Sequence, residues 1–273
     1  MTFRTRKGTA PQQGKRAGTP VVSPMNIALI GCGNIASIIA RKARNVRIVA
    51  VYDADEQRKN TFAAQVGAHA SPDLASLLEE DVALVVEAAS PSAVRQTAQH
   101  VIKAGKDLMV MSVGGLVDPV FRSQLIGLAR EHNHRIYIPS GAIGGLDAIS
   151  AARVGRIDSI TLETRKPPGS LGLTVASETV VFEGTPQEAI ARYPRNINVA
   201  VTLSIIGGDD RVRVTIIADP ATRNNTHRIT VRGEVGTLTF EFANEPSPNQ
   251  ATSLLAGYSA VALLERIAQP LHF

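Results

Sequence analysis

The sequence has little of what several classes of protein require. It contains one cysteine and no tryptophan, and aromatic residues make up 4% of its 273 positions. A single cysteine excludes a framework of internal disulfides, and no Cys/His cluster has zinc-site spacing, so we expect a reducing cytoplasm and no metal. Apolar runs such as 82–86 are far too short to span a membrane. The first 24 residues also lack the apolar segment of a secretory signal.

The body of the chain lacks a surplus of charge of either sign. The whole sequence carries 29 Lys+Arg against 24 Asp+Glu, a net charge of +5. Residues 1–24 contain five basic residues and no acidic one, so the remaining 249 residues carry 24 of each sign. Because residues 1–24 have almost no large apolar side chains, we expect a disordered basic tail, with Met25 as an alternative start. A neutral body argues against a nucleic-acid partner.

Hydrophobic residues make up 44% of the chain, and their pattern between residues 25 and 139 predicts an α/β fold. Short apolar strands alternate there with helical segments, as in a parallel sheet covered by helices on both faces. We therefore predict an N-terminal Rossmann-type doubly wound parallel sheet, with a short element near Ala68. The expected strands are 26–30, 46–52, 82–87, 107–111 and 135–138, and the expected helices are 35–43, 56–66, 72–78, 93–104 and 119–132.

Residues 140–250 have a different pattern, in which polar and apolar side chains alternate along the strands. This predicts a C-terminal α+β domain with a mixed or antiparallel sheet, which we expect to carry the catalytic groups and to form a homodimer. The closing segment, 251–273, follows a proline-rich break and is apolar enough to join the first domain. The expected strands are 157–165, 178–183, 211–218, 227–232 and 236–243, and the expected helices are 185–193, 198–205 and 251–268.

A glycine motif follows the first expected strand. The segment 31–36 reads G-x-G-x-x-A, in which Gly31 permits a tight turn and Gly33 lets a pyrophosphate approach the backbone. Asn34 and Ile35 begin the next helix, whose free N–H groups attract an anion. Asp53 lies 20 residues after Gly33, where a carboxylate can bind a ribose hydroxyl. The motif predicts a bound NAD or NADP, and a glycine turn without a ligand is the alternative.

Three neighbours of this motif bear on its interpretation. Asp53 favours NAD by its charge, while Arg58 and Lys59 lie close enough in sequence to leave NADP open. Cys32 is interpreted as a small packing residue rather than a nucleophile.

Two further loops follow later strands at the edge where doubly wound sheets bind ligands. One contains Ala89 and Ser90, and the other contains Ser112. We expect both loops to line the path of the nicotinamide and its ribose, with ordinary turns as the alternative.

Histidine suits proton transfer near neutral pH, and one of the six stands out. His227 ends a polar loop, 219–227, that enters a strand of the second domain, so it is the candidate acid or base. A structural role for His227 stays open on the residues alone. The remaining five fall on helices, links or the chain end and are interpreted as solvent-facing or terminal: His69, His100, His132, His134 and His272.

These segments carry a family resemblance that covers residues 25–273. The sequence resembles the L-aspartate dehydrogenase family in the stretches GCGNIA, VMSVGGLVD, IPSGAIGGLDAI, TRKPP, VVFEGTPQEAIARYPRNINVAVTLSI, IADPATRNNTHRI and NEPSPNQATSLLAGYSAVALL. The resemblance implies NAD(P)-dependent oxidation of L-aspartate to iminoaspartate. That product hydrolyses to oxaloacetate and ammonia, or serves NAD synthesis.

Site residues follow from the resemblance by position. It places the active-site histidine at His227 and NAD-contacting residues at Ala142 and Asn198, while Ser140 in the same stretch as Ala142 is expected to contact substrate. Asn198 begins a helix, and its amide is expected to hold the nicotinamide ribose or carboxamide and also to contact substrate, although Asn196 is an alternative cap for that helix.

The substrate's chemistry adds two cationic candidates. A dicarboxylate favours Arg or Lys, and Arg165 and Lys166 are the best-placed cations, with a solvent-facing strand end as the alternative.

The sequence departs from the family pattern in two places. The stretch 167–177 is shorter than in many members, and Gly115 stands where alanine is common.

Two other functions are alternatives to this one. One is another two-domain oxidoreductase, such as a homoserine or sugar dehydrogenase or a dihydrodipicolinate reductase. The sugar enzymes usually carry E-K-P where this chain reads 110–114 without Lys or Pro, and the reductase's histidine-pair motif is absent. The other is a dinucleotide-binding redox sensor that binds DNA, which would need a helix-turn-helix or an ordered basic face.

Overall fold

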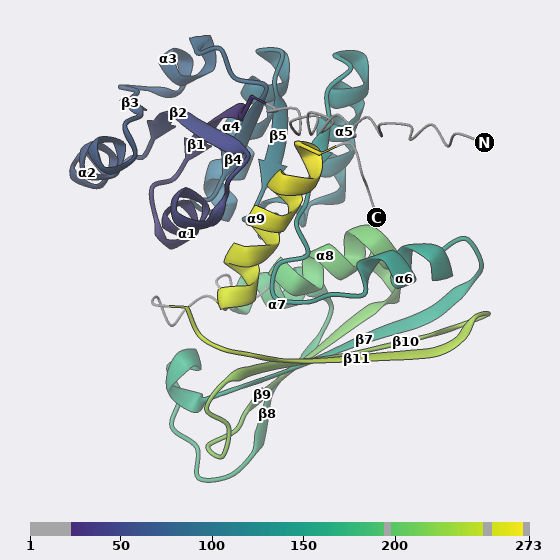
Figure 1. The fold of residues 1–273 in the computed structure, drawn as a ribbon. Coiled ribbons are helices and arrows are strands. Elements are labelled where there is room, and N and C mark those ends of the chain that lie inside the picture. The colour runs from purple at the N-terminus through teal and green to yellow at the C-terminus, as the bar shows by residue number, and fades with distance from the viewer. Residues whose placement is uncertain (1–22, 194–197, 248–252, 270–273) are drawn as a thin grey trace, which may run out of the picture.

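The computed structural model describes residues 23–193, 198–247 and 253–269, and these form two layers, each built on its own sheet (Figure 1). The expected disordered tail lies outside the described residues apart from positions 23 and 24, and so does Asn196.

The first sheet has six parallel strands in the order β3-β2-β1-β4-β5-β6. This order confirms the predicted doubly wound sheet, and it places the reversal of strand order between β1 and β4, where such sheets bind ligands. The strands are β1 (Met25–Ile30), β2 (Val46–Tyr52), β3 (His69–Ala70), β4 (Leu84–Glu87), β5 (Asp107–Val110) and β6 (Ile136–Tyr137). The helices are α1 (Asn34–Lys42), α2 (Glu56–Val66), α3 (Leu74–Glu79), α4 (Pro91–Lys103) and α5 (Pro119–Glu131).

Continuous apolar strands bury side chains on both faces of this sheet. On β1, Ile27 and Leu29 join a cluster with Ile39 of α1, while Ala28 and Ile30 join a second cluster with Val94 of α4. All of these side chains are 0–2% exposed. The two clusters therefore hold helices on opposite faces of the sheet, as the strand pattern predicts.

Short polar side chains set where the helices begin. Asp55, Asp73, Ser90 and Asp118 each accept a hydrogen bond from a backbone N–H in the first turn of α2, α3, α4 and α5. Proline follows the last two caps at the first helical position, where its missing N–H costs nothing. Helix α4 therefore begins at Pro91, two residues before the expected start.

The second sheet has five strands in the order β11-β10-β7-β9-β8. It is mixed as expected, because β7 and β9 run parallel while the other neighbours are antiparallel. Its strands are β7 (Ile157–Lys166), β8 (Thr179–Gly184), β9 (Val212–Ala218), β10 (Asn225–Gly233) and β11 (Gly236–Asn244). Its helices are α6 (Leu146–Ala152), α7 (Pro186–Arg192) and α8 (Asn198–Gly207). Single turns are η1 (Val113–Leu116), which follows β5 of the first sheet, η2 (Pro168–Leu171), which follows β7, and η3 (Asp209–Arg211), which precedes β9.

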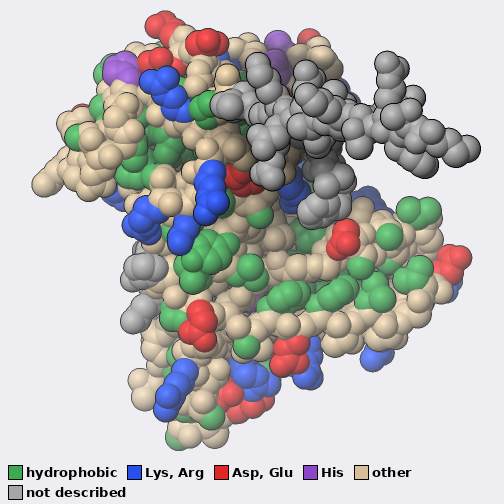
Figure 2. All heavy atoms as spheres, viewed as in Figure 1, with side chains coloured by type: hydrophobic (Ala, Val, Ile, Leu, Met, Phe, Trp, Pro, Cys, Tyr) green, Lys and Arg blue, Asp and Glu red, His purple; other side chains and the backbone are tan. Residues whose placement is uncertain are grey.

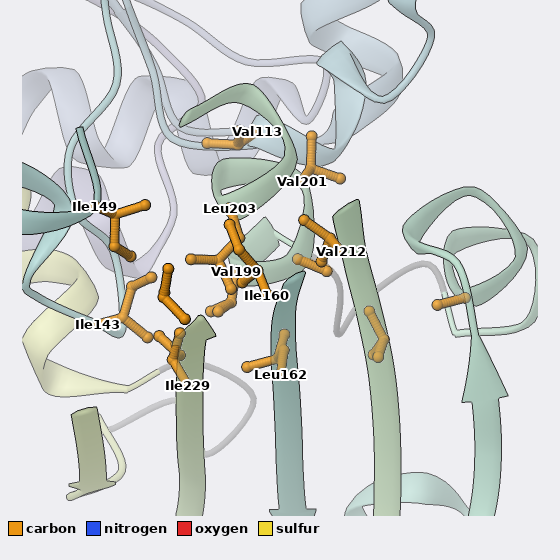
Figure 3. Packing of buried hydrophobic residues seen from close by; sticks show 14 of the residues in the cluster. Val113, Ile143, Ile149, Ile160, Leu162, Val199, Val201, Leu203, Val212 and Ile229 are labelled. Atoms are coloured by element: carbon orange, nitrogen blue, oxygen red, sulfur yellow. The ribbon is translucent and has the colours of Figure 1, made fainter. Parts of the chain in front are cut away.

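The core of the second layer lies between the sheet and α8. Ile160 and Leu162 of β7 and Ile229 of β10 point toward Val199 and Leu203 of α8 (Figure 3). Helices α6 and α8 lie between this sheet and the first layer in Figure 1. One face of the sheet is thus covered by helices that also adjoin the first sheet.

The last helix, α9 (Leu254–Ile267), returns to the first layer and packs along α1. Gly257 makes the approach close, because a Cβ there would lie 2.4 Å from Ile38. Ala260 and Leu264 are fully buried in the cluster that contains Ile39. The N-terminal end of α9 is thereby held where the two layers meet.

The surface seen in Figure 2 carries Lys and Arg side chains interspersed with Asp and Glu. This agrees with the balanced charge of residues 25–273. Within the described ranges, the structure contains no helix that is both long and apolar enough to pass through a membrane.

Candidate active site

A cavity lies where the carboxyl ends of β5 and β7 meet the starts of β10 and α8. It gathers five residues that the sequence predicts for the site: Ser140, Ala142, Lys166, Asn198 and His227. The other lining residues are Val110, Met111, Val113, Pro139, Gly141, Val199, Thr202, Asn225, Ser253 and Ala256. The cavity therefore draws on both layers and on the start of α9.

His227 lies on β10 directly opposite Thr164 of β7, and its side chain is buried. Its Nδ1 is 3.0 Å from the Thr164 hydroxyl, which fixes the orientation of the ring. Burial lowers the pKa of His227 to about 3, and the charge of Lys166 adds to this effect. The imidazole is consequently neutral at pH 7, so one of its two ring nitrogens carries a lone pair.

Lys166 lies two residues beyond Thr164, so both side chains are on the same face of β7 as the cavity. It is 5% exposed, and burial lowers its pKa to about 8. Among the described residues that line the cavity there is no Asp or Glu. A cation in such surroundings favours an anionic ligand.

Arg165 points to the opposite face of β7 and is absent from the described lining of the cavity. It forms ion pairs with Glu163 and Asp219, each at 3.2 Å, and a third with Glu178. These carboxylates raise its pKa. The structure therefore separates the two predicted cations and brings only Lys166 to the cavity.

The glycine motif forms the turn that the sequence predicts, between β1 and α1. Gly31 has φ +97°, and a Cβ there would lie 2.8 Å from the backbone of Ala88. A Cβ on Gly33 would instead meet nothing within 4 Å, which leaves open space above the start of α1. Backbone N–H groups face an open approach at this point, so the motif fits a dinucleotide pyrophosphate.

The other residues of the motif are held by local hydrogen bonds. Asp53 accepts the Cys32 N–H at 2.8 Å and the Asp55 N–H at 2.9 Å, and its Oδ2 lies 3.6 Å from Nε of Arg58. Asn34 donates to the Ser247 hydroxyl at 3.0 Å.

Cys32 and Ile35 complete the turn. Burial raises the pKa of the Cys32 thiol to about 12, so it stays protonated and suits the packing role expected of it. Ile35 is half-buried at the start of α1 and packs beside the cluster that contains Cys32.

Asn198 joins the cavity to a loop of the first sheet. It lies at the start of α8, and its Oδ1 accepts the Gly114 N–H at 2.9 Å. Ala142 is held on the other side, because its carbonyl accepts a hydrogen bond of 2.9 Å from Asn244. Both predicted cofactor contacts therefore lie at the cavity, on the side of the first sheet's ligand edge.

Glu87 is a further residue of this region that the sequence analysis missed. It is the last residue of β4 and is fully buried, yet it carries a carboxyl group among apolar neighbours. It accepts backbone hydrogen bonds from Ala89, Ser90 and Ser112. The signal was available, since a lone acid that ends an apolar strand at the ligand edge needs a partner.

The structure describes both places where the sequence departs from the family pattern. A Cβ on Gly115 would lie 2.6 Å from the Pro91 carbonyl oxygen, so an alanine would require the loop or α4 to shift. The short stretch 167–177 contains the single turn η2, after which the chain enters β8. Neither departure alters a residue that lines the cavity.

Known proteins resemble both layers. Residues 31–139 match the family model of the homoserine dehydrogenase NAD binding domain, and residues 147–267 match that of the aspartate dehydrogenase C-terminal region. The L-aspartate dehydrogenase of Methanothermobacter thermautotrophicus is 44% identical over 253 residues, covering 91% of this chain and 98% of that protein. The L-aspartate dehydrogenase of Methanocaldococcus jannaschii is 39% identical over 262 residues, covering 90% and 98%. The crystal structure of an aspartate dehydrogenase from Thermotoga maritima superposes with a TM-score of 0.75 at 33% identity, covering 91% of this chain and 99% of that one.

Proposed function

The chain belongs to the L-aspartate dehydrogenase family, and from this premise we propose how its cavity oxidises L-aspartate. Membership confirms the predicted resemblance and makes the chain an NAD(P)-dependent dehydrogenase that acts on L-aspartate. The homoserine dehydrogenase match covers the cofactor half alone, so it does not favour a second substrate. The observation that carries the proposal is the meeting of His227 and Lys166 in one buried cavity with Ala142 and Asn198.

Lys166 binds a carboxylate of the substrate in this proposal. Its ammonium lies in the lining of the cavity together with His227, whereas Arg165 is absent from that lining and forms ion pairs with three acids. An ion pair formed away from water is strong, because water no longer competes for either charge. Ser140, which also lines the cavity, supplies a hydroxyl that can donate to the same substrate.

His227 takes the proton that the substrate's ammonium must lose. With its own proton on Nδ1, the imidazole donates to the Thr164 hydroxyl and keeps the Nε2 lone pair for the amine. The pKa of His227 is low partly because Lys166 is charged. A substrate carboxylate on Lys166 offsets that charge, so binding of the substrate raises the basicity of His227 when it is needed.

The bound nicotinamide of NAD or NADP supplies the hydride acceptor. The nitrogen lone pair, freed by His227, forms the C=N bond as hydride leaves Cα, and the product is iminoaspartate. Iminoaspartate then hydrolyses to oxaloacetate and ammonia or enters NAD synthesis. Measuring NADH, oxaloacetate and ammonia together tests this step: we expect equal amounts when no enzyme consumes the imine, and a reaction that yields NADH without ammonia would contradict it.

Asp53 sets the preference between the two cofactors. We expect Asp53→Ser to raise the KM for NAD by about 10-fold, because it removes a charged acceptor for the ribose hydroxyls. The same change removes one of the two carboxylates that attract Arg58, which lies 3.6 Å from Asp53 and 2.9 Å from Asp55. With less negative charge beside it, Arg58 can meet the 2′-phosphate of NADP, so the KM for NADP should fall. Steady-state kinetics with both cofactors check this. Asp55→Asn is the matched control, since asparagine still caps α2 and the KM for NAD should stay within about twofold.

The alkaline limit of activity should report Lys166. Burial lowers its pKa to about 8, so the free enzyme loses the cation that binds substrate as pH rises through that value. We expect kcat/KM for aspartate to fall above about pH 8 for this reason. Arginine is not deprotonated in this range, so in Lys166→Arg the fall should move to higher pH, whatever the absolute rate. If kcat/KM falls at the same pH in both enzymes, another group is responsible for the fall.

We further propose that residues 25–139 with 251–273 bind the cofactor, that residues 140–250 carry the catalytic groups, and that the enzyme is a homodimer. The mixed sheet supports the last point, because helices cover one of its faces and, among the described residues, no α-helix covers the other (Figure 1). Light scattering on the purified chain distinguishes a dimer from a monomer.

A further inference from the structure

Glu87 occupies the point of the first sheet where strand order reverses. It is the last residue of β4 and lies beside Ile30 of β1 on one side and Val110 of β5 on the other. The chain leaves all three strands here to form loops at the ligand edge. Glu87 is fully buried, so a carboxyl group lies under these loops.

Both oxygens of this carboxyl group accept hydrogen bonds from the loops. Oε1 accepts the N–H of Ala89 at 2.8 Å and the N–H of Ser90 at 3.0 Å. Oε2 accepts the N–H of Ser112 at 3.0 Å, across a separation of 25 residues. One side chain thus ties the β4–α4 turn to the β5–η1 turn.

Each of the tied segments continues to a part of the cofactor path. Gly31 of the glycine turn rests on the 88–89 backbone, since a Cβ there would lie 2.8 Å from it. On the other side, the turn that begins at Ser112 leads to Gly114, whose N–H donates to Asn198 at 2.9 Å. Glu87 therefore lies between the pyrophosphate turn and the residue expected to contact the nicotinamide end.

We propose that Glu87 is a positioning residue, whose carboxylate sets the spacing between the two loops that hold the cofactor. It acts through backbone N–H groups rather than by touching substrate. The proposal rests on the proposed function in one respect, namely that the edge of the first sheet and the adjoining cavity bind NAD or NADP.

A carboxylate suits this position better than an amide of the same shape. The three N–H groups require acceptors at both oxygens, and an ionised carboxylate accepts at both. Burial raises the pKa of Glu87, and the hydrogen bonds from these N–H groups oppose that rise by favouring the ionised form. A glutamine has one acceptor and one NH2 group, so in either orientation a donor faces a backbone N–H. One loop would then lose its link to the strand, and a buried donor would have no acceptor.

The test compares NADH affinity and kinetics in Glu87→Gln with those of the intact enzyme. We expect the Kd for NADH, followed by its fluorescence, and the KM for NAD to rise by about 10-fold to 100-fold. The KM for aspartate should change by less than about twofold, because Lys166 and His227 lie on strands of the second sheet, whereas Glu87 lies in the first. A folded Glu87→Gln enzyme whose Kd for NADH stays within twofold of the wild type would overturn the proposal.

A matched control separates positioning from general stability. Val86 precedes Glu87 on β4 and is also fully buried. Its side chain is apolar and therefore cannot accept a hydrogen bond from the loop N–H groups. Val86→Ala should lower the melting temperature through a cavity but leave the Kd for NADH unchanged. If Glu87 only stabilised the fold, Glu87→Gln would likewise lower the melting temperature and leave the Kd for NADH unchanged.

If Glu87→Gln does not fold, Glu87→Asp carries the test, since it keeps the charge but retracts it by one methylene. Hydrogen exchange of the amides at 89, 90 and 112 should speed up in Glu87→Asp while the strands stay protected. Unchanged exchange at those amides would contradict the proposal. NADH binding needs no aspartate, so the two proposals can fail separately. If the wild type does not oxidise aspartate, the proposed function is refuted, while the Kd for NADH still decides the role of Glu87.

Discussion

Replacing His227 with alanine should lower kcat for aspartate oxidation by about 10²-fold to 10⁴-fold, the range typical of lost general-base catalysis. The substrate's amine would remain protonated, and a protonated nitrogen has no lone pair with which to form the C=N bond. The KM for NAD should change little, because the glycine turn and Asp53 lie on the first sheet. Initial rates of NADH formation at saturating aspartate measure the loss.

The control for this change is another histidine of the chain. His100 is exposed on α4, where its Nδ1 lies 3.0 Å from the Gln96 carbonyl oxygen of the same helix, so His100→Ala should leave kcat unchanged. A His227→Ala enzyme with wild-type turnover would remove His227 from the mechanism, and the base would then have to be sought among the other groups in the cavity.

Lys166→Met should have opposite effects on substrate binding and on stability. The substrate carboxylate would lose its buried cation, and we expect the KM for aspartate to rise by about 10²-fold to 10³-fold, as when one partner of a buried charge pair is truncated. Steady-state kinetics at saturating cofactor measure this rise.

Stability should increase in the same variant. In the unfolded chain a lysine binds its proton up to about pH 10.5, whereas the folded protein releases the Lys166 proton near pH 8. Folding is therefore penalised fully below pH 8, and the penalty fades between pH 8 and 10.5. Since one pKa unit represents about 1.4 kcal/mol, removing the lysine should raise the free energy of unfolding at pH 7 by up to about 3 kcal/mol. Urea unfolding at pH 7 of the two proteins checks the sign.

Arg165 supplies the matched control on the same strand. It faces away from the cavity and is paired with three carboxylates, so Arg165→Met should leave the KM for aspartate within about threefold. A larger rise for Arg165→Met than for Lys166→Met would reverse the assignment of the substrate-binding cation.

The first sheet could be predicted from local features of the sequence. Strands such as Val46–Tyr52 are short and apolar, and the glycine motif with Asp53 indicates which strand is first. Element ends were predicted less well, since α4 begins at Pro91 rather than at residue 93, because Ser90 caps it.

The side-chain environment of the site could not be predicted in the same way. Arg165 and Lys166 are adjacent in sequence, and only the alternation of β7 decides which of them reaches the cavity. The Thr164–His227 contact joins residues 63 positions apart and depends on the register of β7 and β10. Even the pKa of His227 departs from the value near 7 that its role suggests, because burial and Lys166 lower it.

Glu87 was overlooked for a related reason. Its position at the end of an apolar strand is plain in the sequence, but its meaning depends on Ser112, which a separate strand brings to it. Local patterns predict elements, whereas such contacts follow from the order of strands in the sheet.

The most direct test of the central claim compares kcat/KM for L-aspartate with that for other amino acids, at fixed NAD or NADP. The panel contains L-alanine, L-asparagine, L-glutamate and L-homoserine. A cavity with Lys166 for a carboxylate and His227 for the amine predicts that L-aspartate is oxidised with the highest kcat/KM and that L-homoserine is not a substrate. Faster oxidation of L-homoserine, or no NADH or NADPH formed from L-aspartate, would contradict it.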